Sequence, residues 1–281
     1  MRSESENWKI ETSFYSVIRI SAWIRYTGLG FVVLLPLLSA CAGDSQSRAQ
    51  LDDGKHAIEA RQYDQAIRDA DSVIQTGDSS GLAEAYYLRG YAIESREKAD
   101  NAAKTRDLAL ARESYSSGLS YTPRPAIAAR LHVQLGNVCY HQEDFAMALR
   151  EFGIAVTQLD QTQFRPQILY EMGICEQCLG RFEDADQTFL RVQQDYAGNE
   201  YAGYAHTRSG IRGFYVQVGM YAQPADIDRA ANAVTASGSV PLKTTHSGLT
   251  VIRTADVPSF GQAQRLKALL AGEYPDARVM P

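Results

Sequence analysis

The sequence predicts a two-domain protein of the α plus α/β class, in which a solenoid of paired helices precedes a small β-α-β-β-α-β domain. Two observations predict this organisation. Glycine, alanine and aromatic residues recur at fixed spacings over residues 49–212, which is the signature of a helical repeat. Over residues 213–281 the apolar positions change to a period of two and then alternate between strand and helix patterns. The chain has 281 residues, enough for two modest domains.

Residues 1–40 differ from the rest of the chain because they have the pattern of an export signal. The uncharged run "GLGFVVLLPLLSA" follows Arg19 and Arg25 and ends in small residues directly before Cys41. A basic flank, a short apolar core and a small-residue end are typical of a secretory signal. The run is also shorter than the roughly twenty apolar residues that a membrane-spanning helix needs.

The tetrapeptide "LSAC" at the end of this run resembles the lipobox of bacterial lipoproteins. In that family the cysteine is lipidated and becomes the first residue of the mature chain. The resemblance implies a signal peptide over residues 1–40, lipidation of Cys41 and a short tether over residues 41–48. Ala42 rather than an acidic residue follows the cysteine, so the expected location is the bacterial outer membrane, with the protein facing the periplasm. An anchor of more than one acyl chain gives stable attachment.

The repeat over residues 49–212 consists of a glycine, an alanine twelve residues later and a packing residue four residues after that. This pattern resembles the tetratricopeptide repeat (TPR), a pair of antiparallel helices in which small residues let the backbones approach and an aromatic ring fills the gap. An insertion in the second unit moves its alanine and its packing residue to Ala111 and Tyr115. The glycines of the four units are Gly54, Gly90, Gly136 and Gly173; in the other three units the alanines are Ala66, Ala148 and Ala185, and the packing residues are Ala70, Phe152 and Phe189.

The resemblance to TPR proteins implies a concave binding face built by the first helix of each pair. Counting along these helices places four tyrosines and one asparagine there. Tyrosine combines an apolar ring with a polar tip and suits protein recognition, although packing between the helices is an equally open interpretation. The basic clamp that some TPR proteins use for acidic C-termini is not expected, because Val133 stands at a position of that clamp. The candidate protein-binding residues are Tyr87, Tyr91, Asn137, Tyr140 and Tyr170.

Residues 213–281 begin with a strand pattern. In "YVQVGMY", residues 215–221, apolar and polar positions alternate with a period of two. Pro224 suits the first turn of a following helix, and the later segments "GSVPLKTT", "GLTVIRTA", "SFGQAQRLKALLA" and "ARVM" predict strand, strand, helix and strand. This order folds into one antiparallel sheet with both helices on the same face, a ferredoxin-like arrangement.

The motif "YVQVGMY" resembles the start of the SPOR domain, a bacterial module that binds peptidoglycan glycan strands lacking stem peptides. The resemblance implies that Tyr215, Gln217 and Tyr221 lie on an exposed glycan-binding face of the sheet. The second half of the domain departs from the family pattern, since Leu249, Thr250 and Thr254 stand where the family usually has tyrosine, arginine and glycine.

Composition and motifs argue against several other functions. The formal net charge of −5 provides no basic field for nucleic acid. The sequence contains no HExxH, glycine-rich phosphate loop or GxSxG motif. Cys175 and Cys178 have a CxxC spacing, but they fall inside a predicted repeat helix, so they and Cys139 are interpreted as buried thiols rather than a disulfide or zinc ligands. We expect no catalytic residues, no enzymatic activity, no metal and no cofactor.

Together these features predict a membrane-anchored envelope lipoprotein. Its helical repeats would bind a protein partner, and its terminal domain would bind glycan strands, in cell division or cell-wall turnover. An alternative is a scaffold subunit of an envelope secretion or outer-membrane assembly complex, in which the terminal domain docks protein. The two hypotheses differ in whether Gln217 or the tyrosines of the repeats are needed for function.

Overall fold

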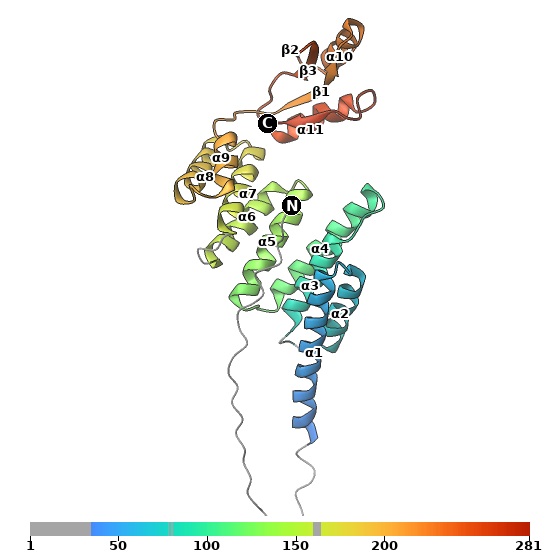
Figure 1. The fold of residues 1–281 in the computed structure, drawn as a ribbon, viewed down its shortest axis with the longest axis vertical. Coiled ribbons are helices and arrows are strands. Elements are labelled where there is room, and N and C mark those ends of the chain that lie inside the picture. Colours follow the sequence, from blue (N-terminus) through green and yellow to red (C-terminus); the bar gives the residue numbers. More distant parts are fainter. Residues whose placement is uncertain (1–34, 78, 80, 160–163) are drawn as a thin grey trace, which may run out of the picture. The chain divides into compact units, whose positions relative to one another are not determined.

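The computed structural model describes residues 35–77, 79, 81–159 and 164–281. Residues 41–281 form one compact unit, in which the part of α1 after Ala40 and helices α2–α9 precede a small domain of strands and helices (Figure 1). Most of the predicted signal peptide, residues 1–34, lies outside the described residues, as do all side chains up to residue 44. Among the residues described, no helix is long and apolar enough to span a membrane.

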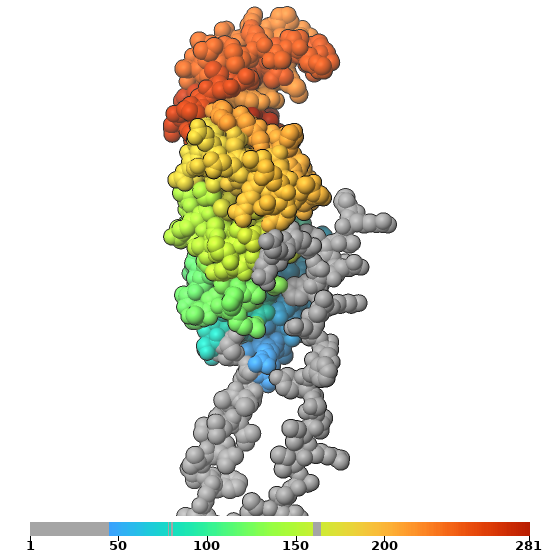
Figure 2. Space-filling view, turned by 90° about the vertical axis from the view of Figure 1, so that its left-hand side faces the viewer, coloured from blue at the N-terminus to red at the C-terminus, as the bar shows by residue number. Residues whose placement is uncertain are grey.

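The helical part is a series of antiparallel pairs, as the repeat predicted. Each pair packs on the next through the contacts α2·α3, α4·α5 and α6·α7, and the pairs follow one another in chain order in the space-filling view (Figure 2). The pairs are α1 (Leu35–Glu59) with α2 (Tyr63–Thr76), α3 (Leu82–Ser95) with α4 (Asn101–Ser120), α5 (Pro125–His141) with α6 (Phe145–Gln158), and α7 (Arg165–Cys178) with α8 (Phe182–Asp195), and α9 (Glu200–Arg208) covers the last pair.

The start of the helical part corrects one prediction. Residues 41–48, expected to be a tether, are helical and belong to α1, which begins at Leu35. The later part of this helix is held by packing, because Leu51 and Ala57 are buried against α2 and α3.

The predicted glycine and aromatic positions meet inside the last three pairs. A Cβ atom added to Gly90 or Gly136 would lie 2.5 Å from a ring carbon of Tyr115 or Phe152, and one on Gly173 would overlap the ring of Phe189 in the same way. The three rings are at most 1% exposed. In the first pair, a Cβ atom added to Gly54 would lie 3.6 Å from its nearest side-chain atoms, and none of these belongs to an aromatic ring. Glycine is therefore required in α3, α5 and α7 because an aromatic side chain occupies the space of its missing Cβ.

The insertion in the second pair lengthens α4, and an ion pair fastens the longer helix to α3. Arg96, the residue after α3, donates from Nε to Asp107 Oδ2 at 2.8 Å and from Nη2 to Oδ1 at 2.6 Å. The Asp107 side chain is 4% exposed. The hydrogen bonds from Arg96 hold the pKa of Asp107 below its ordinary value of 3.8. Such a bidentate pair between planar groups is among the strong hydrogen bonds of proteins.

Asp107→Asn is expected to destabilise the protein by about 1–2 kcal/mol at neutral pH, because the amide cannot accept both hydrogen bonds and loses the charge. The folded-state pKa of Asp107 is depressed, so its contribution is complete above pH 3.8 and is lost as the pH falls through the folded value. Urea unfolding of both proteins at pH 7 and pH 3 checks this. The difference in unfolding free energy between the two proteins should be smaller at pH 3 than at pH 7. The control is Glu113→Gln, on an exposed residue of α4, which should have the stability of the unmutated protein at both pH values.

The terminal domain is a four-stranded antiparallel sheet with the order β2-β3-β1-β4. Helices α10 and α11 both pack on one face: α10 contacts β1, β2 and β3, and α11 contacts β1 and β4. A two-residue turn joins β2 to β3, with Ser247 and Gly248 at positive φ as such hairpins require. The elements are β1 (Tyr215–Tyr221), α10 (Pro224–Ala236), β2 (Pro241–His246), β3 (Leu249–Thr254), α11 (Phe260–Leu270) and β4 (Arg278–Met280).

An aromatic junction connects the helical part to the terminal domain. It consists of Phe145 at the start of α6, Phe182 at the start of α8, Phe214 before β1 and Phe260 at the start of α11. Ring centroids lie 5.2 Å apart for Phe145 and Phe260, 5.6 Å for Phe214 and Phe260, and 6.2 Å for Phe182 and Phe214. The two parts therefore share one hydrophobic core.

Candidate functional site

The sheet of the terminal domain has one face turned away from its helices, which we call the open sheet face. Val216 and Val218 of β1 and Ile252 of β3 are buried on the helix side. Residues on the other side follow from the strand register, since directly opposed residues of antiparallel strands share a face. The open sheet face comprises Tyr215, Gln217, Met220, Leu242, Thr244, His246, Leu249, Val251, Arg253, Arg278 and Met280.

A β-bulge in β1 corrects the predicted position of Tyr221. Gln217 is opposite Arg253, but Gly219 is opposite Ile252, so the register shifts by one residue between Gln217 and Gly219. A bulge adds one residue to a strand and so reverses the faces beyond it. Tyr221 consequently lies on the helix side, where its hydroxyl covers Gly219 and its ring packs against the core.

Tyr215 and Gln217, the other two predicted glycan-binding residues, are both on the open sheet face. Met220 takes the place beyond the bulge that was expected for Tyr221, and this residue is 60% exposed. Leu242 and Leu249 are also exposed on this face. The open sheet face thus carries both polar residues around Gln217 and exposed apolar residues such as Met220.

Gln217 lies in a line of four residues, one from each strand, of which three are polar. The register places Arg253 opposite Gln217 on one side and Arg278 opposite it on the other, with Leu242 beyond Arg253. The Arg253 guanidinium carbon lies 4.4 Å above the Tyr215 ring, which is a cation–π distance. Sequence reasoning missed both arginines, because the pairing of strands decides which positions meet Gln217 and no local pattern encodes it.

Arg253 is held in place from a second side. Its Nη1 donates to Asp256 Oδ1 at 2.5 Å and to the Thr254 carbonyl oxygen at 3.2 Å. The Asp256 side chain is 64% exposed, so solvent screens this ion pair. The contacts fix the plane of the guanidinium while its positive charge remains at the surface.

The predicted protein-binding residues of the helical part do not form one cluster. Tyr87 and Tyr91 stack on each other on α3, with ring centroids 6.2 Å apart. Tyr140 on α5 meets Phe145 edge to face at 5.6 Å, and burial raises its pKa to about 12. Tyr170 on α7 instead contacts Phe189, Tyr201 and Tyr204. Asn137 donates to Gln134 Oε1 on its own helix. These residues are half-buried, so they pack and present surface at the same time.

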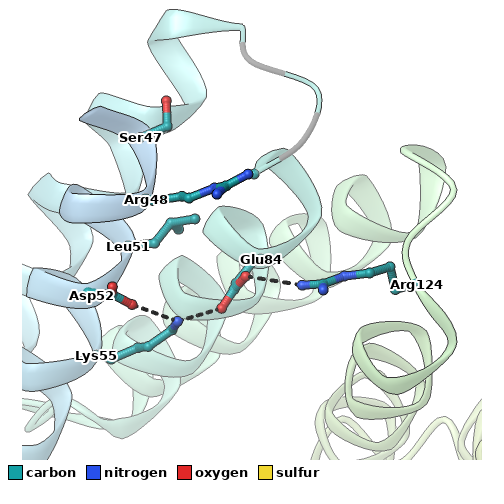
Figure 3. A pocket seen from close by; sticks show the side chains of 8 residues that line it. Ser47, Arg48, Leu51, Asp52, Lys55, Glu84 and Arg124 are labelled. Carbon is teal, nitrogen blue, oxygen red and sulfur yellow. Dashed lines mark hydrogen bonds and ion pairs between the residues drawn. The ribbon is translucent and has the colours of Figure 1, made fainter. Parts of the chain in front are cut away.

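A hollow of about 570 Å³ lies between α1, α3 and the start of α5, and sequence reasoning did not find it (Figure 3). Lys55 Nζ lies 3.0 Å from Asp52 Oδ1 and 2.8 Å from Glu84 Oε1, and Arg124 approaches the other oxygen of Glu84 at 4.0 Å. Burial lowers the pKa of Lys55, but its hydrogen bonds to Glu84 and Asp52 outweigh this and raise it above 10.5. The hollow is therefore lined by fixed charges of both signs.

Cys139, Cys175 and Cys178 are buried free thiols, as predicted. Burial raises the pKa of Cys139 to about 11 and that of Cys178 to about 12, and it raises that of Cys175 further. A thiol with such a pKa is not ionised at neutral pH and is a poor nucleophile or metal ligand. No group of three or more His, Cys, Asp or Glu side chains within the described part of the chain is arranged to hold a metal ion.

Residues 211–281 match the SPOR domain family. The helical part is similar to TTC0263, described as a thermophilic TPR protein of Thermus thermophilus, at 14% identity, with a TM-score of 0.46 over 62% of this chain and 94% of that one. It is also similar to PilF of Pseudomonas aeruginosa, at 14% identity, with a TM-score of 0.45 over 60% of this chain and 70% of that one.

A third structure, YrrB, described as a TPR protein with an unusual peptide-binding site, is 16% identical, with a TM-score of 0.46 over 62% of this chain and 82% of that one. No curated protein matches the sequence. The terminal domain is thus a SPOR domain, and the helical part is built of antiparallel helix pairs.

Proposed function

We propose that this protein is a non-enzymatic envelope scaffold whose SPOR domain binds peptidoglycan glycan strands and whose helical repeats bind a protein partner. The observation that carries the proposal is the match of residues 211–281 to the SPOR domain, on a sheet whose open face presents Gln217 beside an aromatic ring. An amide side chain both donates to and accepts from hydroxyl groups, and aromatic rings stack on the apolar faces of sugars. The scaffold would act in cell division or cell-wall turnover.

We further propose that a lipid on Cys41 anchors the protein in the outer membrane, facing the periplasm. The support is the sequence "LSAC" after a short apolar run, together with Ala42 in place of an acidic residue. Metabolic labelling with a palmitate analogue tests the anchor. Label should enter the unmutated protein and be absent from Cys41→Ser, while Cys139→Ser should still be labelled.

Gln217→Ala is expected to reduce binding to glycan strands about tenfold, because it removes a side chain that makes hydrogen bonds worth about 0.5–1.5 kcal/mol each. The measurement is sedimentation of the full chain, kept in detergent, with sacculi whose stem peptides an amidase has removed. Asn232→Ala is the matched control, since Asn232 is an exposed amide on α10, which packs on the opposite face of the sheet. No enrichment of the unmutated protein over untreated sacculi would contradict glycan binding.

We propose as a second function the docking of a protein partner in an envelope secretion or outer-membrane assembly complex, with the hollow between α1, α3 and α5 as a contact surface. Its fixed charges suit a polar segment of a protein partner. Under this hypothesis, Glu84→Gln and Tyr91→Ala would abolish crosslinking to the partner in cells, and Gln217→Ala would leave it unchanged. The opposite pattern would favour glycan binding as the main function.

A further inference from the structure

We infer that the open sheet face recognises a carboxylate on its glycan, namely the lactyl carboxylate that becomes free when a stem peptide is removed, and that Arg253 and Arg278 bind it from either side of Gln217. This inference rests on the proposed glycan binding. It names the chemical group that separates a peptide-free strand from an intact one.

The strand register carries the first step. Arg253 on β3 and Arg278 on β4 are each directly opposite Gln217 on β1. Neighbouring strands lie about 4.8 Å apart, so the two arginine Cα atoms are about 10 Å apart across the sheet, with the amide between them. All three side chains leave the same face. A group that accepts a hydrogen bond from Gln217 is therefore within reach of a guanidinium on each side.

The second step concerns the state of the two arginines. Arg253 is held between the Tyr215 ring and Asp256, and both of its hydrogen bonds are made by Nη1. A guanidinium has five N–H donors, so further donors remain for a ligand. Arg278 is exposed on the edge strand β4. Asp256 pairs with Arg253, and Arg278 adds a second positive charge beside Gln217.

The third step is the chemistry of the ligand. An intact stem peptide is joined to the lactyl group of the glycan by a neutral amide. Hydrolysis of that bond adds water, releases the peptide with its amino group and leaves a carboxylate on the sugar. Arginine binds carboxylates through paired, charge-assisted hydrogen bonds, whereas it gains no such bond from an amide. Two arginines beside Gln217 therefore favour the peptide-free strand on electrostatic grounds.

The surroundings of the two arginines favour a sugar strand over a nucleic acid. Nucleic-acid surfaces need a concentrated basic stripe that follows many phosphates. Here Met220, Leu242 and Leu249 are exposed on the same face as the two arginines. A peptide-free glycan strand carries one carboxylate per unit, and its sugar rings have apolar faces. The arginines would bind the carboxylates, and the apolar side chains would contact the sugar rings.

The test compares two preparations of amidase-treated sacculi in sedimentation assays with the full chain. One keeps its lactyl carboxylates, and in the other a carbodiimide and methylamine have converted them to neutral methylamides. Binding of the unmutated protein is expected to fall about tenfold on the methylamides, as expected for the loss of a charge-assisted hydrogen bond. Arg278→Gln and Arg253→Gln should each bind the carboxylate form about as weakly as the unmutated protein binds the methylamide form. Conversion to the methylamides should then reduce the binding of these variants little further.

Arg229→Gln is the matched control, because Arg229 is an ion-paired arginine on α10, away from the open sheet face. Equal binding of the unmutated protein to the carboxylate and methylamide forms would overturn the inference while glycan binding stands. Absence of binding to both would instead overturn the proposed function. Equally strong binding to untreated sacculi would overturn both the inference and the proposed binding of peptide-free glycan strands. The methylamide comparison needs no variant, so it holds even where Arg253→Gln fails to fold.

Discussion

Gly136→Val is expected to unfold the helical repeats at a much lower temperature than the unmutated protein. A Cβ at residue 136 would lie 2.5 Å from Phe152 Cε1 and 2.6 Å from Cδ1. Phe152 is 1% exposed and packs within the hydrophobic core. Overpacking of this kind costs about 3 kcal/mol, which lowers the Tm of a domain of this size by about 6–12 °C. Calorimetry or circular dichroism during heating measures the shift.

Gly153→Ala is the control for this prediction, because Gly153 follows Phe152 on α6 and a Cβ there would meet no atom within 4 Å. Alanine favours a helix over glycine by about 0.5–1 kcal/mol, so this variant should be slightly more stable than the unmutated protein. A loss of stability in Gly136→Val and a gain in Gly153→Ala would distinguish crowding against Phe152 from a general effect of replacing a helical glycine. Equal destabilisation by both substitutions would contradict the role assigned to Gly136.

The repeat could be predicted from the sequence because its packing is local. Each glycine and its aromatic partner belong to one helix pair, and the spacing between them is fixed by the length of the hairpin. The same holds for the order of strands and helices in the terminal domain, since each element is encoded by its own period. Even the long hairpin of the second pair kept Gly90 against Tyr115.

The candidate site was predicted less completely, because it depends on which strands pair and in which register. Gln217 and Tyr215 lie before the bulge, so simple alternation placed them on the open sheet face. Tyr221 lies beyond it, and one extra residue moved its side chain to the helix side. The bulge itself has no sequence signal beyond Gly219, and Arg253 and Arg278 meet Gln217 only through pairing with distant segments.

The aromatic junction was also beyond sequence reasoning, although each of its residues is easily found in the sequence. Three of them begin helices, and the fourth precedes a strand, so none lies within an amphipathic pattern that predicts a buried face. Their contacts join residues that are far apart in the chain. The hydrogen bond from Gln264 Nε2 to Glu143 Oε1, 2.6 Å long, adds a polar contact between α11 and the segment before α6.

Phe214→Ala is expected to destabilise the protein by about 3–5 kcal/mol, the usual cost of removing a buried phenylalanine ring. Phe214 is 2% exposed and lies between Phe182 of the repeats and Phe260 of the terminal domain. Its backbone also pairs with Val257 through hydrogen bonds of 2.8 and 2.7 Å, and these survive the substitution. The substitution therefore weakens the contact between the helical repeats and the terminal domain, and it leaves the sheet intact.

The consequence is a change in cooperativity as well as in stability. The shared core lets the unmutated residues 41–281 unfold together, whereas the variant should show two calorimetric transitions, one for the repeats and one for the SPOR domain. Protease cleavage between residues 209 and 213 should accelerate in parallel. Leu269→Ala is the control, since Leu269 is 68% exposed on α11 and its loss should change stability by less than about 0.5 kcal/mol. A single transition with unchanged cleavage in Phe214→Ala would mean that other contacts hold the two parts together.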